Sequence, residues 1–198
     1  MKVRIAFIGT GGIAQAHMER LSRIPGVEFV GMCDIDEEKA KGTSVNYGGR
    51  VYTDYHKMLE ELEVDACYIC IPPFAHKDQE LLCIEKNIPF FVEKPIHLDL
   101  ERAEEIAKKV KEKNLITSVG YVLRYFDIVE KAKKILGKEQ IALVRGRYFG
   151  GVPGEGKGWY TKKELSGGQV IEQATHIVDL MRYLVGEIEE VFAYKFEG

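Results

Sequence analysis

A glycine-rich turn directly after an apolar run constrains the fold of this chain more than any other feature. The run at residues 3–8 predicts a buried strand, and the pattern Gly9-x-Gly11-x-x-Ala14 follows it at once. Such a turn joins a strand to a helix and brings backbone N–H groups close to a phosphate, where the helix N-terminus adds partial positive charge. Glycines also form turns that bind nothing, so the interpretation depends on the context.

That context includes an acidic residue at the end of the second apolar run. Residues 27–33 form this run, and Asp34 follows it roughly 20 residues past the turn, the distance expected for an acid that binds a ribose hydroxyl. The two features together predict a dinucleotide site.

Strand and helix patterns alternate as far as about residue 121. The chain predicts strands at 3–8, 27–33, 51–52, 66–71, 88–92 and 116–120, with helices at 13–24, 36–46, 54–62, up to 86, and 98–113. The near-continuous apolar character of 66–71 is typical of a strand buried on both faces. Repeated strand–helix units predict a parallel sheet with helices on both faces.

The alternation changes after Tyr121, where we expect a domain boundary between residues 1–121 and 122–198. Beyond it the chain predicts helices at 126–136 and 169–184, strands at 141–149 and 188–196, and a glycine-rich loop at 150–168. These few strands alone leave a sheet edge uncovered.

Composition excludes several classes of function. A net charge of -3 argues against a broad nucleic-acid footprint. No apolar run reaches the roughly 18 residues that span a membrane, and the N-terminus begins a strand without the layout of a signal peptide. We expect a cytoplasmic protein that binds neither nucleic acid nor membrane.

Two of the four cysteines, Cys67 and Cys70, have C-x-x-C spacing, which invites a metal or redox interpretation. They lie in a predicted strand, where residues three apart point to opposite faces, and no second Cys or His pair is near. Buried, reduced thiols in a cytosolic protein are the better hypothesis.

The segment Glu93-Lys94-Pro95 follows the fifth predicted strand. Ligands of doubly wound sheets bind beyond the carboxyl ends of the strands, so we expect Lys94 at the ligand crevice. The alternative is that Glu93 and Lys94 form a solvated pair of charges before a loop proline.

A second cluster consists of Glu172, His176 and Asp179, at positions that share one face of a helix. An imidazole between two acids indicates proton-transfer chemistry, and the carboxylates are expected to raise the pKa of the histidine. The alternatives are a solvated polar face and a metal site, for which one histidine and two acids are few ligands.

Further candidates come from single polar or aromatic residues. His76 follows the fourth strand and either lines the crevice, caps the next helix or is exposed. Arg124 and Tyr125 are placed to bind hydroxyls or an anion, or are ordinary surface residues. Trp159 and Tyr160 are suited to stack on a sugar face or to anchor their loop.

In their order and spacing these residues resemble the Gfo/Idh/MocA family of nicotinamide-dependent oxidoreductases, over the whole chain. The resemblance implies an α/β fold, in which a Rossmann doubly wound parallel sheet is followed by part of an α+β C-terminal domain with an open, mostly antiparallel sheet. In the family that sheet builds the oligomer interface, so the resemblance implies a homo-oligomer.

The resemblance also implies roles. The cofactor is NAD rather than NADP, because Asp34 would repel a 2′-phosphate, and no metal is implied. Lys94 would contact the nicotinamide ribose and the substrate hydroxyl, His176 would be the general acid/base, and Glu172 would orient substrate and Lys94. The cofactor would be held by Gly9, Thr10, Gly11, Gly12, Ile13, Ala14, Asp34, Ile71, Pro72, His76, Glu93 and Lys94, and the substrate by Arg124, Tyr125, Trp159 and Asp179.

The chain departs from the family in two respects. The family usually has Asp where this chain has Glu172, and its members are usually much longer. The expected function is hydride transfer between a nicotinamide cofactor and a secondary alcohol or ketone of a sugar, sugar derivative or cyclitol. The alternatives are a dinucleotide-binding module or shortened product without turnover, and a lyase or hydrolase that uses bound NAD transiently.

Overall fold

A six-stranded parallel sheet forms the centre of the computed structural model, which describes residues 2–137, 139–150 and 157–194. The strand order is β3-β2-β1-β4-β5-β6, the doubly wound order of dinucleotide-binding folds. The predicted parallel sheet is therefore confirmed. Its strands are β1 (Val3–Ile8), β2 (Val27–Cys33), β3 (Arg50–Tyr52), β4 (Ala66–Ile69), β5 (Phe90–Val92) and β6 (Thr117–Val119).

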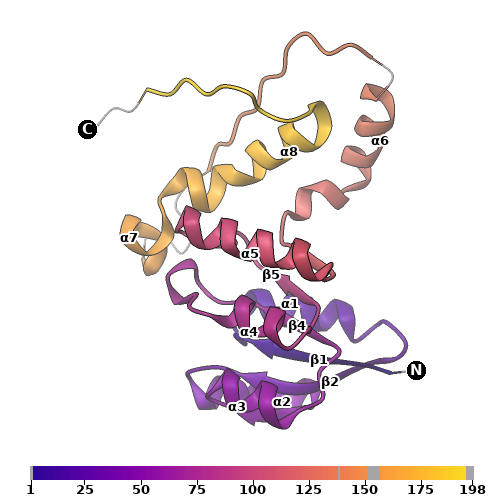
Figure 1. Ribbon diagram of the computed structural model, residues 1–198, viewed down its shortest axis with the longest axis vertical. Helices are drawn as coiled ribbons and strands as arrows, with labels where there is room; N and C mark the ends of the chain where they lie inside the picture. Colours follow the sequence, from indigo (N-terminus) through magenta and orange to yellow (C-terminus); the bar gives the residue numbers. More distant parts are fainter. Residues whose placement is uncertain (1, 138, 151–156, 195–198) are drawn as a thin grey trace.

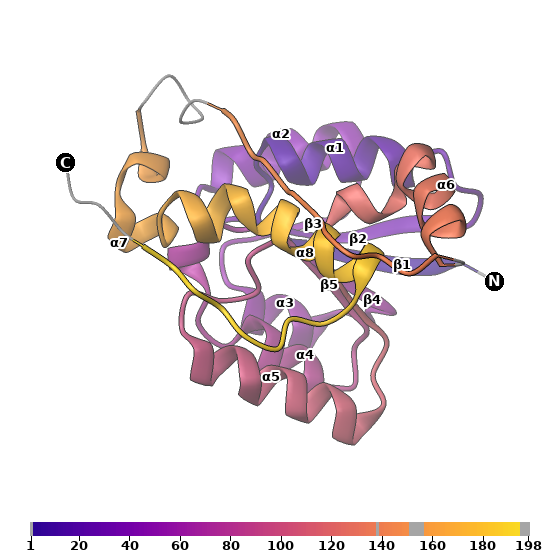
Figure 2. The same cartoon turned by 90° about the horizontal axis from the view of Figure 1, so that it is seen from above.

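Helices cover both faces of the sheet (Figure 2). One face carries α1 (Gly12–Leu21) and α2 (Glu37–Tyr47), and the other carries α3 (Tyr55–Glu61), α4 (Gln79–Glu85) and α5 (Leu100–Lys113). Alternate side chains of β1 supply both cores, because successive residues of a strand point to opposite faces. Phe7 is buried with Met18 of α1, whereas Ile8 is buried with Met58 of α3 and Ile106 of α5.

Aspartates begin three of these helices. Asp36, Asp54 and Asp99 are the N-caps of α2, α3 and α5, and each side chain accepts a backbone N–H of the first turn. Such caps satisfy donors that the helix leaves free. Asn114 ends α5 in the left-handed conformation, a common helix stop.

The C-terminal region is helical in the structure (Figure 1). Its α6 (Asp127–Leu136) packs against α8 (Thr175–Val185). The predicted helix at 169–184 is present, but its first turn, η5 (Val170–Ala174), is a π-helical turn. Three shorter pieces are η2 (Val122–Tyr125), η4 (Trp159–Thr161) and α7 (Lys163–Ser166).

The two strands predicted for this region are wrong for the described residues. Segments 141–149 and 188–194 form no strand pairing, and residues 195–196 lie outside the described part. A strand exists only when a neighbour accepts its hydrogen bonds, and an apolar pattern supplies no neighbour. The loop predicted at 150–168 contains the helical turns η4 and α7, while 151–156 lie outside the description.

All four cysteines are buried free thiols. Cys67 belongs to the core under α3, α4 and α5, and Cys70 to the core under α1, so the two lie on opposite faces as predicted. Burial raises the pKa of the Cys33 thiol to about 12. None of the helices in the described part of the chain has the length and apolar character needed to cross a lipid bilayer.

Candidate active site

The glycine turn packs its first residue directly against the end of β4. Gly9 has a φ of +89°, and a Cβ built on it would lie 2.2 Å from the Cys70 carbonyl oxygen. Only glycine fits here. Gly11 and Gly12 are exposed, and a Cβ on either would meet nothing within 4 Å. The turn therefore combines one position that is closed by the sheet with two that are open to a ligand.

The N-terminus of α1 is suited to an anion. Gly11 is its N-cap, no side chain caps it, and its first turn contains no acidic residue. Backbone N–H groups at such an end point outward and carry partial positive charge. Ala14 is fully buried, where its small side chain lets α1 approach the sheet, while Ile13 is half-exposed. These features fit a dinucleotide pyrophosphate.

Asp34 is held by the turn itself. The backbone N–H and the hydroxyl of Thr10 donate to its Oδ2 at 2.9 and 3.0 Å, and the N–H of Asp36 donates to Oδ1 at 3.0 Å. Thr10 is buried. Its hydroxyl therefore orients the predicted ribose-binding acid, which is a different task from the direct cofactor contact that the sequence implied.

Lys94 and Glu172 come together from segments 78 residues apart. The Lys94 ammonium donates to the Glu172 carboxylate at 2.7 Å and to the backbone carbonyl oxygen of Glu172 at 2.6 Å. The two side chains are only 14% and 8% exposed. The Lys94–Pro95 peptide bond is cis. Lys94 thus lies at the sheet's ligand edge, and the solvated-pair alternative does not describe it.

His176 stands one helical turn past Glu172, but neither neighbouring acid orients it. Its Nδ1 is buried and finds no hydrogen-bond partner among the described residues. The pKa of His176 is lowered, first by burial and then by the charge of Lys94, which together outweigh the nearby carboxylates. The expectation of a raised pKa is therefore wrong, because desolvation favours the neutral ring. The ring lies edge-on to Tyr121 at 6.2 Å.

Asp179 has a partner of its own. Arg124 donates to both of its carboxylate oxygens, from Nε at 2.8 Å and from Nη2, and Asp179 is 4% exposed. This bidentate bond raises the pKa of Arg124 and ties η2 to α8. Substrate binding by these two residues stays a prediction. Tyr125 is 69% exposed and lies outside this pair.

Two aromatic side chains stand next to each other in η4. Trp159 stacks on Tyr160, with ring centroids 3.8 Å apart, and lies edge-on to Phe74 of η1 (Pro73–Ala75) at 6.3 Å. Burial and the charge of Glu172 raise the pKa of Tyr160. Tyr160 therefore lies within reach of the Glu172 charge, and Trp159 connects η4 to the segment after β4.

His76 is buried rather than exposed, and its ring does not cap α4. Its Nδ1 lies 2.6 Å from Glu80 Oε1, and both side chains are 1% exposed. His76 directly follows η1 and Glu80 lies on α4, so the pair joins these two elements. Sequence analysis missed Glu80, because His76 precedes α4 in extended backbone and the two residues do not share one helix face. It also missed Tyr121, for which the sequence carried no signal.

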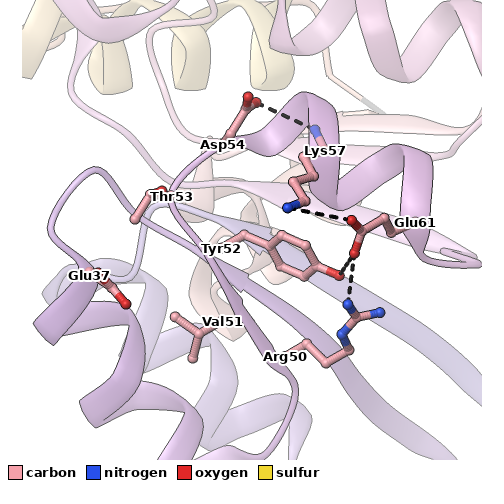
Figure 3. Close-up of a pocket in the computed structure, with 8 residues that line it drawn as sticks. All are labelled: Glu37, Arg50, Val51, Tyr52, Thr53, Asp54, Lys57 and Glu61. Atoms are coloured by element: carbon pink, nitrogen blue, oxygen red, sulfur yellow. Dashed lines mark hydrogen bonds and ion pairs between the residues drawn. The ribbon is translucent and has the colours of Figure 1, made fainter.

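A separate hollow of about 320 Å³ lies at β3 (Figure 3), where the carbonyl of its lining residue Tyr52 accepts the Asp34 N–H at 3.1 Å. Arg50, Tyr52 and Lys57 surround the Glu61 carboxylate there, at 2.7, 3.0 and 3.7 Å. Because this carboxylate already has its partners, we do not assign the predicted chemistry to this hollow.

Comparison with known proteins agrees with this geometry. Residues 3–121 match the family of oxidoreductases with an NAD-binding Rossmann fold, Gfo/Idh/MocA, and residues 132–196 match the C-terminal domain of that family. Among curated proteins, Thermotoga maritima myo-inositol 2-dehydrogenase is 27% identical over 96% of this chain and 58% of its own length. The NAD(+)-dependent scyllo-inositol 2-dehydrogenase of Bacillus subtilis is 30% identical over 93% of the chain and 54% of its own length.

A solved structure shows the same arrangement. Myo-inositol 2-dehydrogenase from Lactobacillus plantarum superposes with a TM-score of 0.82 at 28% identity, over 93% of this chain and 57% of that protein. The chain thus spans about half the length of the relatives it matches. Because the models of its two domains match residues 3–121 and 132–196, the chain belongs to the Gfo/Idh/MocA oxidoreductase family.

Proposed function

We propose that this chain carries the reaction centre of an NAD-dependent dehydrogenase that acts on a secondary alcohol of a sugar, sugar derivative or cyclitol. The observation that carries the proposal is the Lys94–Glu172 pair. It lies beyond the carboxyl end of β5, where ligands of such sheets bind. Two relatives of this chain are named as inositol dehydrogenases, and their names support the substrate class.

The residues of the chain divide the work of an alcohol oxidation. A nicotinamide held at the glycine turn would supply the acceptor for the hydride of the carbinol carbon. His176 takes the hydroxyl proton as general base, and its lowered pKa keeps the ring neutral and ready to accept a proton near neutral pH. The Lys94 ammonium donates to the substrate oxygen and stabilises negative charge as it develops there.

Glu172 and the aromatic residues prepare this site. Glu172 holds the Lys94 ammonium in one direction through two of its own oxygens. Trp159 and Tyr160 present stacked rings, and the apolar face of a sugar or cyclitol ring fits such a surface. Arg124, Tyr125 and Asp179 are further candidates for contacts with substrate hydroxyls.

The test is NADH formation by the purified chain on a panel of inositols, sugars and sugar acids. We expect turnover on at least one of them and its loss in Lys94→Ala. The matched control is Lys108→Ala, which removes an exposed lysine of α5. Turnover that survives Lys94→Ala would remove Lys94 from the mechanism. Failure to bind NADH, measured by its fluorescence, would remove the whole proposal.

A second candidate function is dinucleotide binding without turnover. The observation that favours it is that the chain spans only 54–58% of the length of these relatives, whose named activities are those of the longer proteins. Tight NADH binding, with no turnover on any substrate of the panel, is the result expected of such a module. Turnover on any substrate of the panel excludes it.

We also propose that the chain associates with copies of itself in the cytoplasm. Apolar side chains of the segments 143–149 and 188–194 support association, since Leu143, Phe149, Phe192 and Tyr194 are each more than 80% exposed. The four buried free thiols support a reducing compartment. Light scattering at rising protein concentration tests association, and a mass that stays at that of one chain contradicts it.

A further inference from the structure

A histidine of the cofactor-binding helix touches the acid that precedes Lys94. His17 lies on α1, little more than one turn past the glycine turn, and its Nε2 is 2.7 Å from Glu93 Oε1. The side chains are 19% and 14% exposed. A carboxylate only accepts hydrogen bonds. The Nε2–H group of His17 is therefore the donor of the hydrogen bond to Glu93.

The His17 ring is fixed by aromatic neighbours of the sheet. Phe91 meets it edge-on with centroids 4.8 Å apart, and Tyr68 lies tilted to it at 5.6 Å. These rings come from β5 and β4, so the sheet sets the direction of Nε2. Held from two sides, the imidazole has little freedom to leave Glu93.

Glu93 is equally confined. Its backbone N–H donates to the Ile69 carbonyl at 3.0 Å, and its Oε2 accepts the N–H of Lys94 at 3.3 Å. A Cβ on Gly120 would lie 2.6 Å from the same Oε2, so the missing side chain at Gly120 leaves room for this carboxylate. One Glu93 oxygen thus contacts α1, while the other contacts the backbone of Lys94.

A continuous series of contacts results. It runs from α1 through His17 and Glu93 to Lys94, and from the Lys94 ammonium to Glu172. The helix whose N-terminus fits a pyrophosphate is thereby linked to the lysine that faces the substrate. The nicotinamide end of a cofactor bound at that helix must meet Lys94 with a defined geometry, because rate depends steeply on alignment.

We propose that His17 is a positioning residue, which fixes the Glu93 carboxylate and through it the direction of the Lys94 ammonium relative to the cofactor held by α1. The effect of this role on turnover rests on the dehydrogenase function proposed above. The effect on the direction of the Lys94 ammonium does not depend on that function, so the decisive measurement is made on Lys94.

Two substitutions separate the hydrogen bond from packing. His17→Leu fills the space between Phe91 and Tyr68 but donates nothing. His17→Gln places an amide N–H at the reach of Nε2 and restores the donor. The matched controls are His56→Leu and His56→Gln, because His56 also contacts a carboxylate, Asp78 at 3.3 Å, but is half-exposed and remote from Lys94.

The decisive measurement is the acylation rate of Lys94 by an amine-reactive acetylating reagent, followed by mass spectrometry of its peptide from pH 7 to 10. In the parent chain Glu172 restrains the Lys94 side chain. We expect His17→Leu to raise this rate across the pH range, with His17→Gln and both His56 variants like the parent chain. Thermal unfolding identifies any variant that fails to fold; if His17→Leu does so, His17→Met, which also donates nothing, takes its place.

The second measurement is turnover. We expect kcat to fall by about 10- to 100-fold in His17→Leu, while the Kd for NADH stays near that of the parent chain, since the glycine turn is untouched. Equal Lys94 acylation in His17→Leu and the parent overturns the proposal. So does an equal change in His17→Leu and His17→Gln, which would point to ring packing. Absence of turnover in the parent removes the dehydrogenase function only.

Discussion

The Lys94 ammonium donates to two oxygens of a single residue, Glu172, at 2.6 Å to its carbonyl and 2.7 Å to its carboxylate. Glu172 lies in the π-helical turn η5, and such turns are frequent at functional sites. One residue of the C-terminal region therefore holds the key lysine of the parallel-sheet region by both its side chain and its main chain.

Replacing Glu172 by Gln should weaken both stability and turnover. The substitution removes a charged acceptor from a largely buried ammonium, which costs about 1.5–3 kcal/mol of unfolding free energy. Urea denaturation measures this loss, and Glu164→Gln on exposed α7 is the control. Full stability together with full kcat in Glu172→Gln would show that the carbonyl contact alone holds Lys94.

The lowered pKa of His176 predicts a pH profile. The neutral ring accepts the substrate proton, so alcohol oxidation should rise with pH through an apparent pKa below the ordinary value of about 6.5. Ketone reduction needs the protonated ring and should fall over the same interval. The His176 signal in an NMR titration checks the pKa without turnover.

The charge of Lys94 is the second cause of this shift. Lys94→Met should therefore move the pKa of His176 upward, because it removes a positive charge that disfavours the imidazolium ion. Lys108→Met, at an exposed position of α5, should leave the His176 titration unchanged. An unchanged His176 pKa in Lys94→Met would attribute the whole shift to burial.

Two glycines of one turn should respond differently to the same added methyl group. Gly9→Ala forces a side chain at φ +89° against the Cys70 carbonyl, at about 1–2 kcal/mol for the backbone and about 1–3 kcal/mol for the overlap. Gly11→Ala meets open space at φ -68° and should unfold like the parent chain.

For cofactor binding we expect the opposite order: among variants that fold, Gly11→Ala should lose more NADH affinity than Gly9→Ala. The methyl group of Gly11→Ala points into the space where the pyrophosphate approaches the backbone, so NADH affinity should drop without loss of stability. Fluorescence titration and thermal unfolding of the two variants provide the comparison. Parent-like NADH affinity in Gly11→Ala would argue against the pyrophosphate position.

Asp34 should set the preference for NAD over NADP. Two unit charges about 4 Å apart repel by about 1 kcal/mol in water and about 4 kcal/mol near a protein surface. Asp34→Asn should then improve the NADPH to NADH affinity ratio by about tenfold or more. Thr10→Val, which removes only one of the bonds to Asp34, should change the ratio less, as competitive titrations can measure.

The local patterns of the first 121 residues were enough to predict their fold. The glycine turn and the apolar runs each act within a few residues, and both agree with the parallel sheet that formed. The strands predicted at 141–149 and 188–196 had no such support. Strand formation depends on a partner at long range, and residues 141–149 and 188–194 have none within the described chain.

The features of the candidate site also fall into two groups, those that local sequence patterns predicted and those that contacts between distant segments decided. The sequence by itself determined that Lys94 follows a strand, that Asp34 ends one, and that Glu172, His176 and Asp179 share a helix. Only the tertiary structure decided the partners: Glu172 for Lys94, Arg124 for Asp179, and burial without a partner for Nδ1 of His176. Residue types and spacing fix what a side chain is able to donate or accept, but desolvation and contacts between distant segments determine which bond it makes and which way its pKa moves.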